Sequence, residues 1–122
     1  MRSLRILVVE DDDLIGMLLG AMLEGMGHEV VAVVATEDEA VAAAARYQPD
    51  LMIVDVQLRE GSGPSAIARV LEFGPVPHLF MSGAAQRTEA IGVVSLQKPF
   101  REEGLLQAIR RALESQPKAM PQ

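Results

Sequence analysis

The sequence contains no cysteine and no tryptophan, and only 3% of its 122 residues are aromatic. The absence of cysteine excludes disulfide bonds and thiolate metal sites, and it agrees with a reducing compartment. The scarcity of aromatic rings leaves no stacking platform for single-stranded bases. Basic residues are also few, because 11 Lys and Arg face 17 Asp and Glu and leave a net charge of -6. This charge argues against direct binding of nucleic acid.

Long apolar runs are missing as well. No stretch approaches the roughly 20 residues that span a bilayer, and the first apolar run ends at Glu10 and Asp11, too early for the core of a signal peptide. We therefore expect a cytoplasmic protein without membrane insertion. With 49% hydrophobic residues, the chain can bury the core of one domain. We expect that domain over residues 1–116, followed by a flexible tail over 117–122.

Short apolar runs alternate along the chain with segments of helical periodicity. The runs at 4–10 and 50–55 are continuous rather than alternating, which is typical of strands buried on both faces of a parallel sheet. The pattern predicts strands over 4–10, 30–35, 50–55, 77–82 and 92–97. It predicts helices over 13–26, 36–47, 64–72 and 101–115. This order favours an α/β fold with a doubly wound, five-stranded parallel sheet.

Chemically useful side chains follow four of the predicted strands. Glu10 and Asp11 end the first, Asp55 the third, Ser82 the fourth and Lys98 the fifth. Carboxyl ends of parallel strands meet at one edge of an open α/β sheet, where such sheets bind ligands. Converging carboxylates repel one another unless a cation neutralises them, and Mg²⁺ prefers oxygen ligands of this kind. We therefore predict a magnesium site at this edge.

The same residues suit the handling of a phosphoryl group. An ionised Asp such as Asp55 can attack phosphorus and become an aspartyl phosphate. The ammonium of Lys98 and the hydroxyl of Ser82 are suited to stabilise the added charge. Taken singly, each residue is more often a turn, cap or surface residue. Their joint occurrence on different strands favours the functional interpretation.

Three segments together resemble a known family. The family is the receiver domain of bacterial two-component response regulators. Leu7 to Asp12 is similar to its acidic opening, and Leu51 to Asp55 is similar to its phosphoacceptor strand. Lys98 to Phe100 is similar to its lysine-proline-aromatic signature. The resemblance runs from about 4 to 113 and implies a CheY-like, flavodoxin-like fold. It also implies a phosphoprotein of a phosphorelay signal transduction system rather than an enzyme acting on outside substrates.

The resemblance assigns a role to each site residue. It implies that Asp55 accepts the phosphoryl group, that Asp11 binds Mg²⁺ directly and that Glu10 acts mainly through water. The third metal ligand in the family is a backbone carbonyl, here that of Gln57. Ser82 and Lys98 would contact the phosphoryl group.

Two departures from the family concern the switch. The first departure is Ser95, which stands where most receivers carry an aromatic switch residue. The Lys98-Pro99 bond, by contrast, is expected to be cis as in the family. Ser82 and Lys98 are also several residues too close for a full fourth helix. We therefore expect residues 84–90 to form a shortened or disordered fourth helix, as in the FATGUY-type single-domain response regulators that Phe80 to Gly83 resembles. Phosphorylation would then reorder the loop over 83–92.

The resemblance further implies partners. The phosphodonor is expected to be a sensor histidine kinase or a histidine phosphotransfer protein, and the signal would pass to a downstream protein target. Leu14, Ile15 and Leu18 are candidates for donor docking, although we expect at least two of them to be core. A monomer is expected before phosphorylation.

Two other classes of function compete with this interpretation. One is a receiver-shaped scaffold that is not phosphorylated. The other is a small phosphatase of the haloacid dehalogenase type, which also uses a nucleophilic Asp at a strand end. Such phosphatases carry a second Asp two residues after the nucleophile, where this chain has Gln57.

Overall fold

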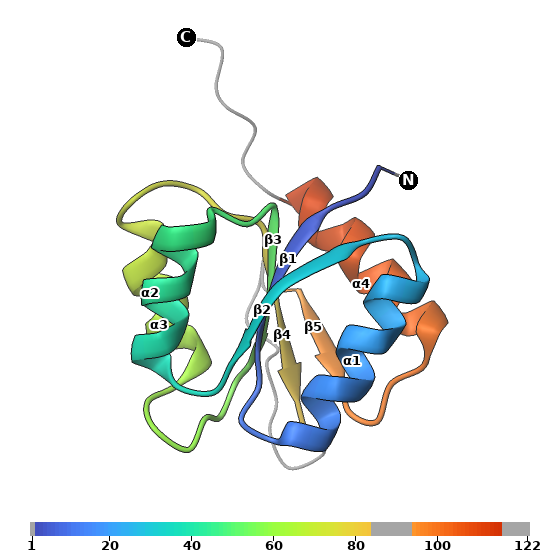
Figure 1. Cartoon of the computed structure of the whole chain (residues 1–122), viewed down its shortest axis with the longest axis horizontal. Coiled ribbons are helices and arrows are strands. Elements are labelled where there is room, and N and C mark those ends of the chain that lie inside the picture. The colour runs from blue at the N-terminus through green and yellow to red at the C-terminus, as the bar shows by residue number, and fades with distance from the viewer. Residues whose placement is uncertain (1, 84–93, 116–122) are drawn as a thin grey trace, which may run out of the picture.

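The structure is a computed structural model that describes residues 2–83 and 94–115. Strands and helices alternate through most of this range (Figure 1). The strands are β1 (Arg5–Val9), β2 (Glu29–Val34), β3 (Leu51–Asp55), β4 (His78–Ser82) and β5 (Ser95–Gln97). The helices are α1 (Asp13–Gly25), α2 (Glu37–Tyr47), α3 (Gly63–Leu71) and α4 (Glu102–Ser115). All of the predicted strands and helices in the described ranges are present, with small differences at their ends.

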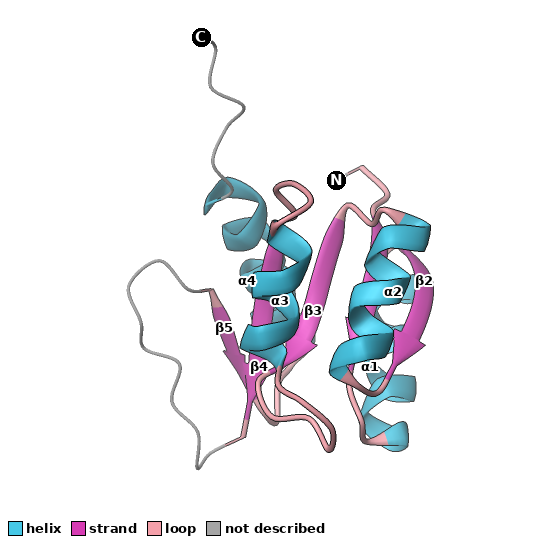
Figure 2. Cartoon of the chain, turned by 90° about the vertical axis from the view of Figure 1, so that its left-hand side faces the viewer, coloured by secondary structure: helices cyan, strands magenta, loops and turns pink. Residues whose placement is uncertain are grey.

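The five strands form one parallel sheet in the order β2-β1-β3-β4-β5. Helices α1 and α4 cover one face, and α2 and α3 cover the other (Figures 1 and 2). Because the sheet is parallel, the carboxyl ends of all five strands lie at the same edge. The predicted doubly wound α/β fold is confirmed.

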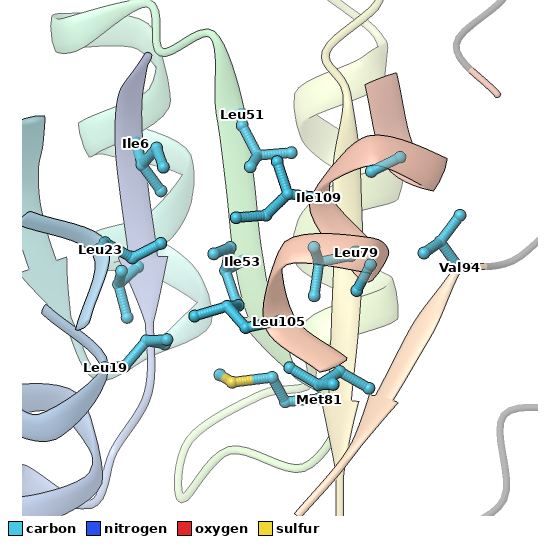
Figure 3. Packing of buried hydrophobic residues seen from close by; sticks show 14 of the residues in the cluster. Ile6, Leu19, Leu23, Leu51, Ile53, Leu79, Met81, Val94, Leu105 and Ile109 are labelled. Atoms are coloured by element: carbon cyan, nitrogen blue, oxygen red, sulfur yellow. The ribbon is translucent and has the colours of Figure 1, made fainter. Parts of the chain in front are cut away.

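Each face of the sheet carries its own hydrophobic core. Between the sheet and α1 and α4, the central strands bury alternate residues such as Ile6 and Ile53. Figure 3 shows Leu105 and Ile109 of α4 packed with Leu51 and Ile53 of β3. The intervening residues, such as Leu7 and Met52, pack against α2 and α3. This two-sided burial explains why the central strands are apolar without alternation.

Side-chain caps fix where three helices begin. Asp12, Thr36 and Ser62 each accept a hydrogen bond from a backbone N–H in the first turn of α1, α2 and α3. At the start of α2, Glu39 N donates to Oγ1 of Thr36 at 3.1 Å, which is half of a capping box. The Glu39 carboxylate accepts from Ala35 N at 2.9 Å rather than from the N–H of the cap residue.

The orientation of α1 differs from expectation. We expected at least two of Leu14, Ile15 and Leu18 to be core, and this was wrong. Leu14 and Leu18 are 72% and 58% exposed, as is the neighbouring Met17 at 73%, and Ile15 is only partly buried. The buried stripe is instead Gly16, Leu19 and Leu23. Both sides of this helix are apolar, and Gly16 decides between them because its missing side chain allows close approach to the sheet. A Cβ built there would lie 3.1 Å from a methyl group of Val33.

A buried histidine lies near the start of the sheet. His28 accepts a hydrogen bond from Leu4 N at its Nδ1, at 3.1 Å. Its Nε2 is buried and has no hydrogen-bond partner within the described residues. Burial lowers the pKa of this imidazole, with a smaller contribution from the N-terminal ammonium, so the ring is neutral at pH 7.

Several predictions concern the region between β4 and α4 and the end of the chain. The predicted fifth strand began at 92, but β5 begins at Ser95, and Val94 still accepts a hydrogen bond from Phe80 N. The expected short fourth helix over 84–90, most of the 83–92 loop and the tail over 117–122 lie outside the described residues. No helix among the described residues is long and apolar enough to cross a membrane.

Candidate functional site

The predicted site residues lie together at the carboxyl edge of the sheet. Glu10 follows β1, while Asp55 and Ser82 are the last residues of β3 and β4, and all three are buried. Lys98 follows β5, and its backbone N–H donates to the carbonyl oxygen of Ser82 at 2.8 Å. Parallel pairing therefore brings together side chains that are far apart in the sequence.

Three carboxylates form a compact cluster at this edge. One carboxylate oxygen from each of Glu10, Asp11 and Asp55 lies within 4.8 Å of the other two. Hard oxygen donors at such mutual distances suit a divalent cation of the Mg²⁺ or Ca²⁺ type. The donor set therefore fits the metal that the sequence predicts.

Lys98 is the cation that the structure places against this cluster. Its Nζ lies 2.7 Å from Oε1 of Glu10 and 3.0 Å from Oδ2 of Asp55. The two hydrogen bonds link the ends of β1 and β3 through a residue after β5. Three carboxylates beside one ammonium form a site that suits a further cation.

The pKa directions at the site follow from this geometry. Burial of Glu10 and its proximity to Asp55 raise the pKa of Glu10 above its usual range, even though Lys98 and the N–H of Asp12 act in the opposite direction. Burial disfavours the charged form of Lys98, but its hydrogen bonds to Glu10 and Asp55 outweigh that effect and raise its pKa. Lys98 is therefore charged at neutral pH.

Backbone contacts hold the acidic side chains in place. Oε2 of Glu10 accepts from Asp12 N at 3.1 Å, and Oδ1 of Asp55 accepts from Gln57 N at 3.4 Å. The second contact places Gln57 beside Asp55 at the start of the loop that connects β3 to α3. The direction of the Gln57 carbonyl stays a prediction.

The predicted switch residues lie on β4, on β5 and directly after Lys98. Ser95 begins β5 and is partly buried. The Lys98-Pro99 peptide bond is cis, as predicted. Ser82 is the last residue of β4 and is buried, and its contact with a phosphoryl group stays a prediction.

Sequence reasoning missed two residues that link the β3-α3 loop to its neighbours. Arg59 donates from Nη2 to the backbone carbonyl of Asp11 at 3.2 Å and so links the β3-α3 loop to the β1-α1 loop. Glu37, at the start of α2, accepts a hydrogen bond from Ser62 N at the end of that same loop. Neither contact has a local signal in the sequence, because the partners are distant along the chain.

A groove of about 380 Å³ lies between α2 and α3. Its lining includes Gln48 and Pro49 before β3 and Gly74 to Val76 before β4. The groove is therefore at the amino-terminal edge of the sheet, opposite the carboxylate cluster.

Comparison with known families identifies this combination of fold and site. Residues 6–110 match the response regulator receiver domain. The chain belongs to the receiver domain family. The receiver is similar to chemotaxis protein CheY of Bacillus subtilis, with 28% identity over 89% of this chain and 97% of that protein. These findings place it among the receiver modules of two-component signalling.

Further similarity is to regulators named PhyR. The phyllosphere-induced regulator PhyR of Methylorubrum extorquens is 35% identical over 88% of this receiver and 43% of that protein. The solution structure of the PhyR receiver domain of Erythrobacter litoralis has a TM-score of 0.80, 29% identity and 97% coverage of each chain. The receiver spans about half the length of the relatives PhyR and PdtaR that it matches.

Proposed function

We propose that this receiver accepts a phosphoryl group on Asp55 in a Mg²⁺-dependent reaction and thereby changes its binding to a partner protein. Asp11 would hold the metal directly and Glu10 would hold it through water, with the backbone carbonyl of Gln57 as a further ligand. One observation carries the proposal, namely the cluster of carboxylate oxygens within 4.8 Å that Lys98 neutralises in part. Bound Mg²⁺ would supply charge neutralisation for the incoming phosphoryl group.

The transfer is a displacement at phosphorus. One carboxylate oxygen of Asp55 forms the new O–P bond while the P–N bond of a phosphohistidine breaks. The electron pair of that bond stays on the imidazole nitrogen, which takes up a proton. Asp55 is buried at a strand end, so its carboxylate is held in place for attack and does not have to be ordered during the reaction.

Lys98 and Ser82 stabilise the phosphorylated form of Asp55. Lys98 already lies 3.0 Å from Asp55, and its ammonium stabilises the negative charge that a phosphoryl group brings. Ser82 donates its hydroxyl hydrogen to a phosphoryl oxygen. Because the backbone N–H of Lys98 donates a hydrogen bond to the carbonyl oxygen of Ser82, movement of Ser82 would be transmitted to the end of β5.

The phosphodonor is a histidine kinase or a histidine phosphotransfer protein that docks on α1. Leu14, Met17 and Leu18 give α1 an exposed apolar face that begins beside Asp11. An amphipathic helix of a donor can cover such a face. This placement would bring a phosphohistidine on the donor toward Asp55.

The first test is phosphorylation by a small donor. Incubation with acetyl phosphate and Mg²⁺ is expected to add the mass of one phosphoryl group to the wild type, and no mass to Asp55→Asn or to the wild type in EDTA. Equal labelling of Asp55→Asn would overturn the assignment of Asp55. A wild type that is never labelled and does not bind Mg²⁺ would support a scaffold instead.

The docking face has a separate test. Leu18→Lys is expected to slow transfer from a phosphohistidine donor that labels the wild type, while labelling by acetyl phosphate is unchanged. Leu71→Lys, at an exposed leucine on α3, is the matched control. Equal slowing by both variants would argue against docking on α1.

A further inference from the structure

The Glu37 side chain accepts hydrogen bonds from residues that are far from it in the sequence. This first residue of α2 accepts from Ser62 N at 3.1 Å, from Ser65 Oγ at 2.8 Å and from Arg69 Nη1 at 3.0 Å. Its own backbone N–H donates to the carbonyl oxygen of Glu60 at 3.1 Å. The side chain is 15% exposed, so most of its surface is covered by these partners.

The segment that Glu37 holds is the loop between β3 and α3, residues 56–62. Gly61 lies directly against Glu37, and a Cβ added to Gly61 would overlap with the Cβ of Glu37. Gly61 also has a φ of 88°, a conformation that residues with a side chain rarely adopt. The absence of a side chain at this position allows the loop to pack closely on α2.

The same loop carries Gln57, which lies beside Asp55. Gln57 and Ser62 form an isolated antiparallel bridge, and Gly63 N donates to the carbonyl oxygen of Val56 at 2.9 Å. The two ends of the loop are thus tied to each other. A constraint applied at Ser62 by Glu37 is therefore transmitted across the bridge to Gln57.

We propose that Glu37 is a positioning residue for the metal and phosphorylation site, which it serves by fixing the β3-α3 loop from the side remote from Asp55. This inference rests on the proposed function. Loops are mobile unless their backbone groups are bonded to a rigid element, and Glu37 supplies such an element, the first turn of α2. Removal of a residue that fixes the orientation of a metal ligand commonly weakens metal affinity by 10-fold or more.

Asp38 provides a matched control within the same helix turn. It accepts from the same Nη1 of Arg69 at 2.9 Å, but it is 89% exposed. Loss of Asp38 therefore weakens the ion pair with Arg69 while the Ser62 and Ser65 contacts to Glu37 remain. A difference between variants at positions 37 and 38 isolates the effect on the loop.

The experiment is titration of the full chain with Mg²⁺ by calorimetry, together with amide hydrogen exchange of the loop. Glu37→Ala is expected to raise the Kd for Mg²⁺ about 10-fold and to speed exchange at Gln57 and Ser62. Asp38→Asn should change the Kd less than about 2-fold, because an exposed ion pair contributes little. Glu37→Gln keeps the size and one neutral acceptor, and it should fold and give an intermediate Kd.

Each outcome separates the two proposals. Wild-type affinity in both Glu37 variants would refute the positioning role and leave the proposed function intact. A wild type that fails to bind Mg²⁺ would refute both. Equal weakening of Mg²⁺ binding by Glu37→Ala and Asp38→Asn would show that the change in affinity arises through Arg69 and not through the loop. That result would also overturn the inference.

Discussion

Gly63 offers a sharp test of how the site is built. It is the first residue of α3, and a Cβ at this position would overlap with the carbonyl oxygen of Asp55 and lie 2.9 Å from Cγ1 of Val54. Backbone atoms cannot move aside as a flexible side chain can. Gly63→Ala must therefore displace either the start of α3 or the peptide of Asp55, at a cost of about 1–3 kcal/mol, typical of overpacking.

Gly20 is the matched control for this substitution. It lies inside α1, and a Cβ there meets no described heavy atom within 4 Å, so Gly20→Ala should stabilise the helix by about 0.5–1 kcal/mol. Urea denaturation followed by circular dichroism is expected to move the midpoint down for Gly63→Ala and up for Gly20→Ala. A Gly63→Ala protein as stable as the wild type would refute the close packing of α3 on Asp55.

Three more substitutions test other parts of the structure. Lys98→Met leaves Glu10 and Asp55 without their shared cation and should lower the free energy of unfolding at pH 7 by about 1–3 kcal/mol; an unchanged urea midpoint would contradict this. Because burial lowers the pKa of His28, the unfolded state binds more protons than the folded state below about pH 6.5, and stability should fall there by up to ~1.4 kcal/mol per pH unit. His28→Asn keeps a hydrogen-bond acceptor and should remove that slope, whereas a slope that persists would point to another group. Thr36→Ala removes the cap of α2 and should lower the unfolding free energy by about 1 kcal/mol in the same assay.

The sequence was most informative where one physical rule relates the order of residues along the chain to their position in the fold. Continuous apolar runs identify parallel strands, and the parallel sheet then requires that Glu10, Asp55, Ser82 and Lys98 meet at one edge. The structure places all of them there. No knowledge of side-chain orientation was needed for that step.

Prediction failed where a choice depends on packing in three dimensions. Helix α1 has two apolar stripes, and periodicity alone cannot show that Gly16 faces the sheet while Leu14 and Leu18 face solvent. The role of Glu37 was hidden for a related reason. Its partners Ser62 and Arg69 are distant in sequence, and only the packing of α2 beside α3 brings them together.

The central claim is that Asp55 itself carries the phosphoryl group. Reduction of the phosphorylated protein with borohydride converts an acyl phosphate of aspartate to homoserine, and tandem mass spectrometry of the digested chain then locates that residue. Our account predicts homoserine at position 55, formed only when both acetyl phosphate and Mg²⁺ were present. Homoserine at position 11 or at another carboxylate, or its formation without Mg²⁺, would contradict the account.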